Sequence, residues 1–109
     1  MPKHGPVASE QDLDQLTALF RLLSDKTRLN ILMLLAAGER NVSSLCAELR
    51  LPQPTVSHHL GLLRMNNVIG NRRSGKQVFY TLNGRVNVDG MGLEVGMDNF
   101  AVKITSPPG

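Results

Sequence analysis

The sequence predicts an α+β domain that is mainly α-helical, in which four helices precede a β-hairpin. Apolar residues recur at helical spacing in four segments before residue 67, and two β-prone runs follow around a connection that contains Gly75. A length of 109 residues with 41% hydrophobic residues fits one small domain with a single core. The predicted division is a flexible tail at 1–8, the domain at 9–83, an extension at 84–105 and a tail at 106–109.

The first helix is expected to begin after Ser9. A serine side chain can accept a hydrogen bond from the backbone of the first turn, and Asp12 is a weaker form of the acid of a capping box. A long apolar stripe follows at helical spacing: Leu13, Leu16, Leu19, Phe20 and Leu23. The stripe predicts an amphipathic helix.

A second helix is expected from Lys26 to about Ala37. Asp25 is a suitable N-cap for it, and Gly38 is a suitable residue to end it at the C′ position. Apolar residues leave it almost no polar face: Leu29, Ile31, Leu32, Leu34 and Leu35. We therefore expect this helix to be the most buried of the domain.

Two short amphipathic helices are predicted next, joined by the turn Arg50-Leu51-Pro52. Asn41 or Ser43 can cap the third helix, whose apolar residues have i, i+3, i+4, i+7 spacing: Val42, Leu45, Cys46 and Leu49. The fourth helix extends from Gln53 to Asn66 and has the same spacing at Val56, His59, Leu60 and Leu63. Pro54 suits its first turn. This pair predicts a helix-turn-helix.

The face of the fourth helix opposite its apolar stripe carries short hydrogen-bonding side chains in the first turns. These residues are Gln53, Thr55, Ser57 and His58. Such groups at a helix N-terminus can read base edges in the major groove of DNA, while the helix dipole favours nearby phosphate. The fourth helix is therefore the predicted recognition helix.

The hairpin is predicted from Val68 to Arg73 and from Gln77 to Leu82, around Ser74-Gly75-Lys76. A hairpin directly after a helix-turn-helix is a wing, so the predicted fold is a winged helix-turn-helix. In the second strand, alternation directs Val78, Tyr80 and Leu82 inward and Phe79 to the other face. Phe79 is then either a partner contact or part of a half-exposed surface.

Positive charge is concentrated on the predicted recognition helix and wing. Between Arg50 and Arg85 there are six basic residues and no Asp or Glu, although the net charge of the whole chain is only +3. This distribution is typical of a phosphate-binding face, although a small domain can also carry a charged face without a partner. The predicted DNA-binding residues are Gln53, Thr55, Ser57, His58, Arg64, Arg72, Arg73 and Lys76.

The extension after Leu82 is rich in glycine and shows no helical period. Apolar residues alternate on both sides of Asp89-Gly90, which predicts two short strands around a two-residue turn. The alternating residues are Val86, Val88, Met91, Leu93, Val95 and Met97. Residues 98–104 could add one more turn or strand.

A single cysteine excludes an intrachain disulfide framework and a multi-cysteine zinc site within one chain. Cys46 lies on an apolar stripe, where a free cysteine commonly acts as a small hydrophobic residue. The longest apolar run, at 31–37, is too short for a signal core or a membrane span, so a cytoplasmic protein without membrane contact is expected. Paired carboxylates, nucleophile motifs and phosphate-binding loops are absent from the sequence, which argues against an enzyme and against a cofactor.

The run Leu51-Pro-Gln-Pro-Thr-Val-Ser-His-His-Leu60, together with Ser24–Leu29 and Arg72–Lys76, resembles the ArsR/SmtB family of bacterial winged helix-turn-helix repressors over roughly residues 13–82. The resemblance implies a homodimer that binds a short palindromic operator until a small inducer, often a metal ion, releases it. It also implies that His59 packs between helices.

The metal ligands of that family do not carry over. The positions that match its Cys-x-Cys and Asp ligands are Asn41, Ser43 and Ser44, and the chain after Leu82 has neither a histidine nor a predicted helix for the second family site. No metal is therefore expected, even at the adjacent His58 and His59, and the inducer is unknown. Without the last family helix, the first helix would have to supply the dimer contact, alone or with the C-terminal strands.

The function predicted from the sequence is a sequence-specific DNA-binding transcriptional repressor that acts as a homodimer. Two alternatives stay open: a winged-helix module that binds a protein, and a repressor that responds to oxidation of Cys46. RNA binding is disfavoured because aromatic residues, which would stack on unpaired bases, make up only 4% of the chain.

Overall fold

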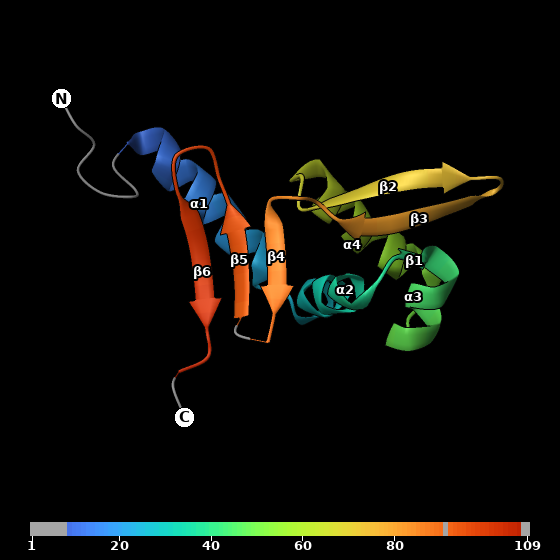
Figure 1. The fold of residues 1–109 in the computed structure, drawn as a ribbon. Coiled ribbons are helices and arrows are strands. Elements are labelled where there is room, and N and C mark those ends of the chain that lie inside the picture. Colours follow the sequence, from blue (N-terminus) through green and yellow to red (C-terminus); the bar gives the residue numbers. More distant parts are fainter. Residues whose placement is uncertain (1–8, 91, 108–109) are drawn as a thin grey trace.

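Four helices precede a wing in the computed structural model, which describes residues 9–90 and 92–107 (Figure 1). The helices are α1 (Glu10–Leu23), α2 (Lys26–Ala37), α3 (Val42–Leu49) and α4 (Gln53–Met65). The strands are β1 (Arg40–Asn41), β2 (Ile69–Ser74), β3 (Gln77–Leu82), β4 (Val86–Asp89), β5 (Gly92–Gly96) and β6 (Ala101–Thr105). This order confirms the predicted fold class. The predicted tail at 1–8 lies outside the described residues, as do positions 108–109 of the second tail.

The helices begin where their capping residues predict. Ser9 Oγ, Asp25 Oδ1 and Asn41 Oδ1 each accept a hydrogen bond from the backbone N–H three residues further along, at 3.0, 3.0 and 2.8 Å. Asn41, rather than Ser43, is therefore the cap of α3. Each bond satisfies a donor that the first helical turn leaves unpaired, so these caps fix the helix starts from local sequence alone.

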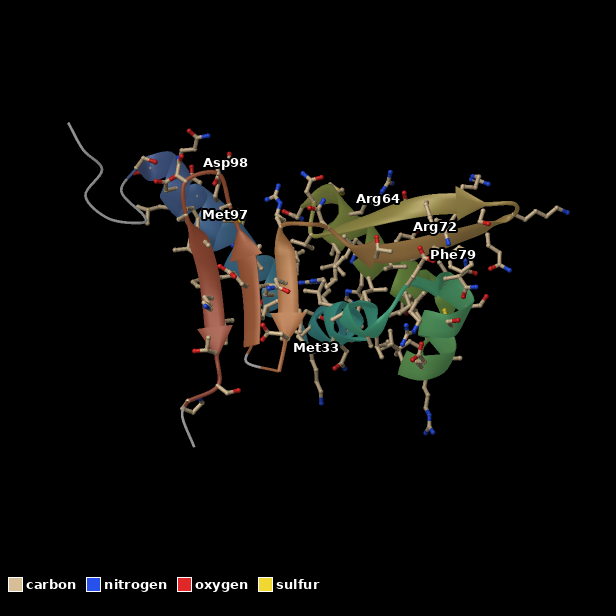
Figure 2. All side chains as sticks on the ribbon, viewed as in Figure 1. Met33, Arg64, Arg72, Phe79, Met97 and Asp98 are labelled. Carbon is tan, nitrogen blue, oxygen red and sulfur yellow. The ribbon has the colours of Figure 1, made fainter. Side chains whose placement is uncertain are left out.

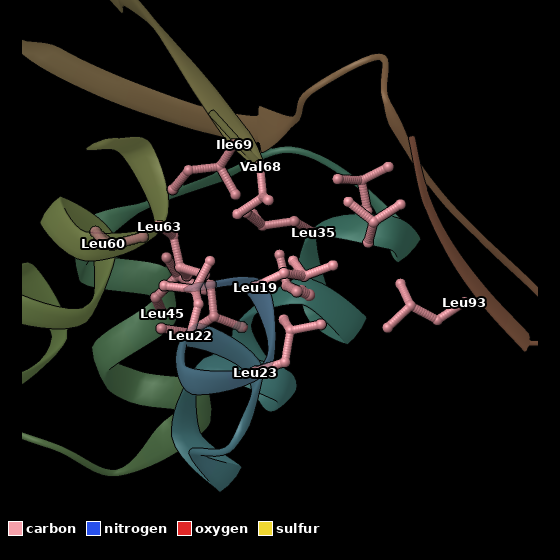
Figure 3. Packing of buried hydrophobic residues seen from close by; sticks show 14 of the residues in the cluster. Leu19, Leu22, Leu23, Leu35, Leu45, Leu60, Leu63, Val68, Ile69 and Leu93 are labelled. Carbon is pink, nitrogen blue, oxygen red and sulfur yellow. The ribbon is translucent and has the colours of Figure 1, made fainter. Parts of the chain in front are cut away.

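The core forms where α1, α2, α3 and α4 meet the start of the wing (Figure 3). Ile31, Leu32, Leu45, Val56 and Leu63 are completely buried. Helix α2 buries Ile31, Leu32 and Leu35, but Met33 is 42% exposed (Figure 2). The polar residues of α2 lie in its first turns, at Lys26, Thr27, Arg28 and Asn30, so the exposed surface beyond them is apolar.

The apolar stripe of α1 is only partly buried. Leu19 and Leu23 lie in the core together with Leu22, whereas Leu13 is 48% and Phe20 is 53% exposed. The last two residues are seven apart and therefore share one flank of the helix. This leaves an apolar flank on α1.

The wing belongs to a three-stranded antiparallel sheet with the order β1-β3-β2. Ser74 belongs to β2 and pairs with Gln77, so the hairpin connection is the two residues Gly75-Lys76 and not the predicted three residues Ser74-Gly75-Lys76. The two-residue strand β1, which the sequence did not predict, pairs with β3 through Arg40 and Tyr80. This pairing joins the segment before α3 to the wing.

A second three-stranded antiparallel sheet, β4-β5-β6, follows the wing and packs on α1 and α2 (Figure 1). Its buried side chains Val86, Leu93 and Val95 belong to the same hydrophobic cluster as the helices. Asp89 pairs with Gly92, so the predicted turn is shifted by one residue, because Asp89 still belongs to β4. The predicted strand residue Met91 lies outside the described residues. The segment at 98–104, expected to add a turn or a strand, contributes most of the third strand, β6.

In the part of the chain that the structure describes, no helix combines the length and the hydropathy that a membrane span needs.

Candidate nucleic-acid interface

Helix α4 presents two faces of opposite character. Its apolar face is sealed in the core, since Val56, Leu60 and Leu63 are at most 2% exposed. The four side chains predicted to read DNA are all exposed in the first turns: Gln53, Thr55, Ser57 and His58. With a 3.6-residue period, Thr55, Ser57 and His58 lie outside this apolar stripe, whereas Gln53, three residues before Val56 and seven before Leu60, lies on the same side as the stripe. Gln53 is exposed at the first position of the helix, so the four predicted residues together form the exposed surface of its first turns, named here the α4 flank.

His59 lies between helices and not on the α4 flank. It is half-buried, and its Nδ1 lies 3.3 Å from Nη1 of Arg28 in α2. Because a guanidinium only donates hydrogen bonds, this contact favours the histidine tautomer with the proton on Nε2. The ring of His58 meets that of His59 edge-on, with centroids 5.5 Å apart and planes at 60°. Within residues 9–90 and 92–107, no group of three or more His, Cys, Asp or Glu residues could hold a metal ion.

Arg72 and Arg73 are neighbours on β2 and therefore point to opposite faces of the wing. Arg72 donates from Nε and Nη2 to the two carboxylate oxygens of Glu39, at 2.7 Å each, and its guanidinium carbon lies 4.9 Å from the ring centroid of the half-buried Phe79. Arg73 and Lys76 are exposed, and neither has an ion-pair partner among the described residues.

The contact between Glu39 and Arg72 changes the pKa of both side chains. The hydrogen bond from Arg72 lowers the pKa of Glu39, and the same bond raises the pKa of Arg72. The pair thus stays fully ionised at neutral pH, and the charge of Arg72 is compensated inside the chain. Phe79 lies under this guanidinium, as part of the half-exposed surface that was one of its two predicted roles.

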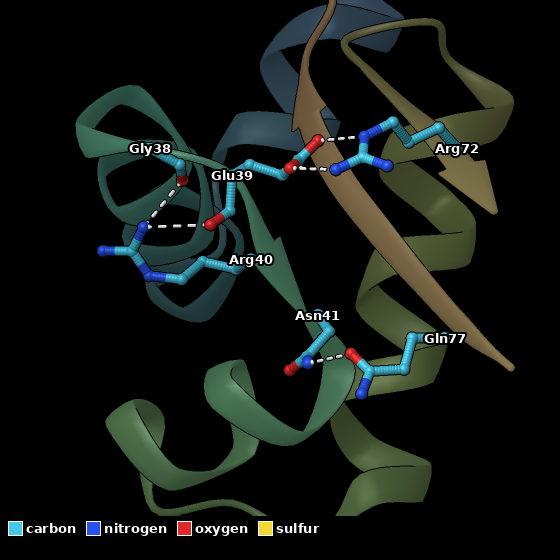
Figure 4. Close-up of polar contacts among 6 residues, drawn as sticks. All are labelled: Gly38, Glu39, Arg40, Asn41, Arg72 and Gln77. Carbon is cyan, nitrogen blue, oxygen red and sulfur yellow. Dashed lines mark hydrogen bonds and ion pairs between the residues drawn. The ribbon is translucent and has the colours of Figure 1, made fainter. Parts of the chain in front are cut away.

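Glu39 was missed by the sequence analysis. It stands outside the acid-free stretch from Arg50 to Arg85, and only the pairing of β1 with β3 brings it to the wing (Figure 4). The same pairing allows Asn41 Nδ2 to donate to Gln77 Oε1 at 2.8 Å. No local sequence signal identifies either contact, because their partners are 33 and 36 residues apart.

Arg64 is exposed in the last turn of α4, apart from the other predicted residues of that helix. Eleven residues separate it from Gln53, which places it about 16 Å further along the helix axis. Arg64 lies on the side of the molecule where β2 begins (Figure 2). It is therefore not part of the α4 flank.

Comparison with known proteins assigns the family. A sequence profile described as "Bacterial regulatory protein, arsR family" matches residues 25–69. The chain is 35% identical over 71 residues to the transcriptional repressor SdpR of Bacillus subtilis (strain 168), covering 65% of this chain and 79% of SdpR. The chain belongs to the ArsR family.

Two further ArsR-family matches extend this result. The arsenical resistance operon repressor of Escherichia coli (strain K12) is 44% identical over 69 residues, which are 62% of this chain and 59% of that repressor. The solution NMR structure of the homodimeric winged helix-turn-helix DNA-binding domain Mb0332 from Mycobacterium bovis has a TM-score of 0.64 and 32% identity, over 70% of this chain and 73% of that one. These proteins are regulators and not enzymes, in agreement with the prediction from the sequence.

The positions that match the metal ligands of the ArsR family have structural contacts here. Asn41 caps α3 and binds Gln77, and Ser44 donates its backbone N–H to that cap. Cys46 is a free, half-buried thiol packed against the core, and its backbone carbonyl accepts the N–H of Leu51 at 3.2 Å. Its contacts are those of a small apolar residue on the inner side of α3.

Proposed function

We propose that this protein is a DNA-binding transcriptional repressor that acts as a homodimer on a palindromic duplex. The α4 flank is the observation that carries this proposal. Gln53, Thr55, Ser57 and His58 are exposed together at the N-terminal end of a helix whose other face is anchored in the core. In an ArsR-family chain, that arrangement suits insertion into the major groove.

Sequence selection and affinity come from different residues in this proposal. The α4 flank offers amide, hydroxyl and imidazole groups that can pair with base edges, and these groups give specificity. The exposed cations Arg64, Arg73 and Lys76 neutralise phosphates and release counterions, so the affinity falls as the salt concentration rises. The N-terminus of α4 adds a partial positive charge near the backbone.

A homodimer would place two α4 helices about 34 Å apart, one turn of duplex DNA, and would require a two-fold symmetric site. Mb0332, which is described as homodimeric, supports such an assembly. In this chain, the apolar flank of α1 with Leu13 and Phe20 is the surface best suited to the contact, because burial of large apolar side chains drives association.

Selection of bound sequences from a random duplex pool tests this proposal most directly. We expect enrichment of an inverted repeat whose half-site centres are 10 to 11 base pairs apart, about one helical turn. A folded, dimeric protein that enriches no sequence would reject the proposal and favour a module that binds a protein instead.

A further inference from the structure

The Glu39–Arg72 ion pair crosses the whole sheet that carries the wing. Glu39 directly precedes β1, Arg72 lies on β2, and Phe79 lies on the strand between them (Figure 4). The pair has two hydrogen bonds of 2.7 Å in parallel, the geometry in which an arginine and a carboxylate restrict each other most. Phe79 supports the guanidinium from its ring face, with the guanidinium carbon 4.9 Å from the ring centroid. Arg72 is therefore held by contacts to two other segments.

The base of the wing packs on the helices through the buried Ile69 and the partly buried Tyr80 and Leu82, whereas the outer part of β2 is exposed. Strand β1 has only two residues, and its partners are Tyr80 and Phe79 on β3. From Asn71 to the tip, β2 is exposed and pairs only with β3. A two-stranded hairpin alone is marginally stable in water, so the Glu39–Arg72 pair and the Asn41–Gln77 hydrogen bond add support to the outer part of the wing.

The two arginines of the wing consequently differ in what they can offer to DNA. The Nε and Nη2 donors of Arg72 are bonded to Glu39, and its charge is compensated. Arg73 faces the other side of the wing and keeps its charge free of any ion pair within the described part of the chain. A cation that is already paired releases few additional counterions when phosphate approaches.

We propose that Glu39 is a positioning residue for DNA binding: through Arg72 it fixes the angle of the wing relative to α4, and it leaves Arg73 and Lys76 as the cations of the wing that contact phosphate. This inference rests on the proposed DNA-binding function.

The direction in which Glu39→Gln changes the affinity for DNA tests the inference. The probe is the duplex obtained by selection from the random pool. By charge alone, removal of an anion beside the wing tightens binding to DNA. A positioning role predicts the opposite, namely affinity weakened about two- to fivefold on every duplex, with an unchanged salt dependence. Arg72→Gln should do the same, and the double variant should be no weaker than either single variant.

Two matched variants serve as controls. Glu48→Gln removes an acid from the other exposed ion pair, Arg40–Glu48, and should leave DNA binding unchanged. Arg73→Gln should reduce the slope of log K against log salt by about one per half-site. Tighter binding by Glu39→Gln, or an equal loss of slope in Arg72→Gln and Arg73→Gln, would overturn the inference.

Amide hydrogen exchange gives a measurement that does not depend on DNA. Glu39→Gln should accelerate exchange in β2 and β3 relative to both the wild type and Glu48→Gln. Unchanged exchange in the wing would reject the positioning role even if the wild type binds its duplex normally. Failure of the wild type to bind any duplex would instead reject the proposed function, and the two failures are thus distinguishable.

Discussion

The winged part at 9–83 and the sheet β4-β5-β6 differ in how each is built, and the sheet lies beside α1 at the end of the molecule away from the wing (Figure 1). The winged part has helices that surround side chains with no exposed surface, such as Leu45 and Val56, and it contains the segment matched by the family profile. The sheet buries one face only, and its opposite face carries polar residues such as Asn87 and Lys103. We therefore expect the winged part to contact DNA, while the sheet completes the core.

The sheet is nevertheless joined closely to the helices. Asn99 Nδ2 donates to the buried carboxylate of Asp12 at 3.1 Å, and Gln15 Nε2 donates to Asp98 at 3.2 Å. These contacts tie the β5–β6 connection to α1, while Val95 lies in the common core. We therefore expect the two parts to unfold together while only the winged part affects DNA binding.

Glycine-to-alanine substitutions should have opposite effects in the two parts. At Gly92, φ is 156° and an added Cβ would overlap the backbone carbonyl of Ile104, so Gly92→Ala should reduce the free energy of unfolding by about 3 kcal/mol or more. At Gly61 of α4, an added Cβ meets nothing within 4 Å, so Gly61→Ala should raise stability by about 1 kcal/mol. Urea denaturation measures both. If both substitutions changed the stability in the same direction, one of these two local environments would be misassigned.

Ser57→Ala should weaken binding to the selected duplex by about 1–3 kcal/mol, because it removes a hydrogen-bonding group from the α4 flank. Binding to an unrelated duplex should change little, since phosphate contacts are retained. Fluorescence anisotropy titrations with both duplexes measure the difference. Thr105→Ala, which removes an exposed hydroxyl from β6 instead, is the matched control and should change neither affinity.

Val95→Ala should reduce the free energy of unfolding by about 1–2 kcal/mol, because two buried methyl groups are lost from a side chain that is 1% exposed. Circular dichroism follows the helices, and amide exchange follows β5. Both measurements should give the same midpoint of unfolding. Lys103→Ala on the exposed face of β6 is the control and should have little effect. Separate midpoints would show that the sheet is an independently melting unit.

Asp25→Asn should change the pH dependence of stability by a small amount. The hydrogen bond from the backbone N–H of Arg28 lowers the pKa of Asp25 below its usual value. The carboxylate therefore contributes stability above about pH 4, and that contribution is lost as the pH falls through the lowered pKa. Asparagine is an equally good cap but does not titrate. The stability of the variant should thus approach that of the wild type below pH 4 in urea titrations, and parallel curves would contradict this assignment.

Much of the fold could be predicted because it depends on neighbours within four residues. Ser9, Asp25 and Asn41 satisfy backbone donors in their own first turns, so the helix starts follow from local sequence. Helical spacing likewise predicted that Ser57 would face away from Val56 and the core. The α4 flank was thus already visible as a pattern in the chain.

Contacts between residues more than four positions apart in the sequence depend on the tertiary structure. Glu39 meets Arg72 across 33 residues because β1 pairs with β3, and strand pairing depends on the packing of the helices on both sides of it. The exposure of Phe20 and Met33 also follows from packing, since the sequence pattern does not say how much of an apolar helix surface the other elements can cover. Periodicity assigns a side chain to a face, whereas contacts between distant segments determine whether that face is buried, paired or free.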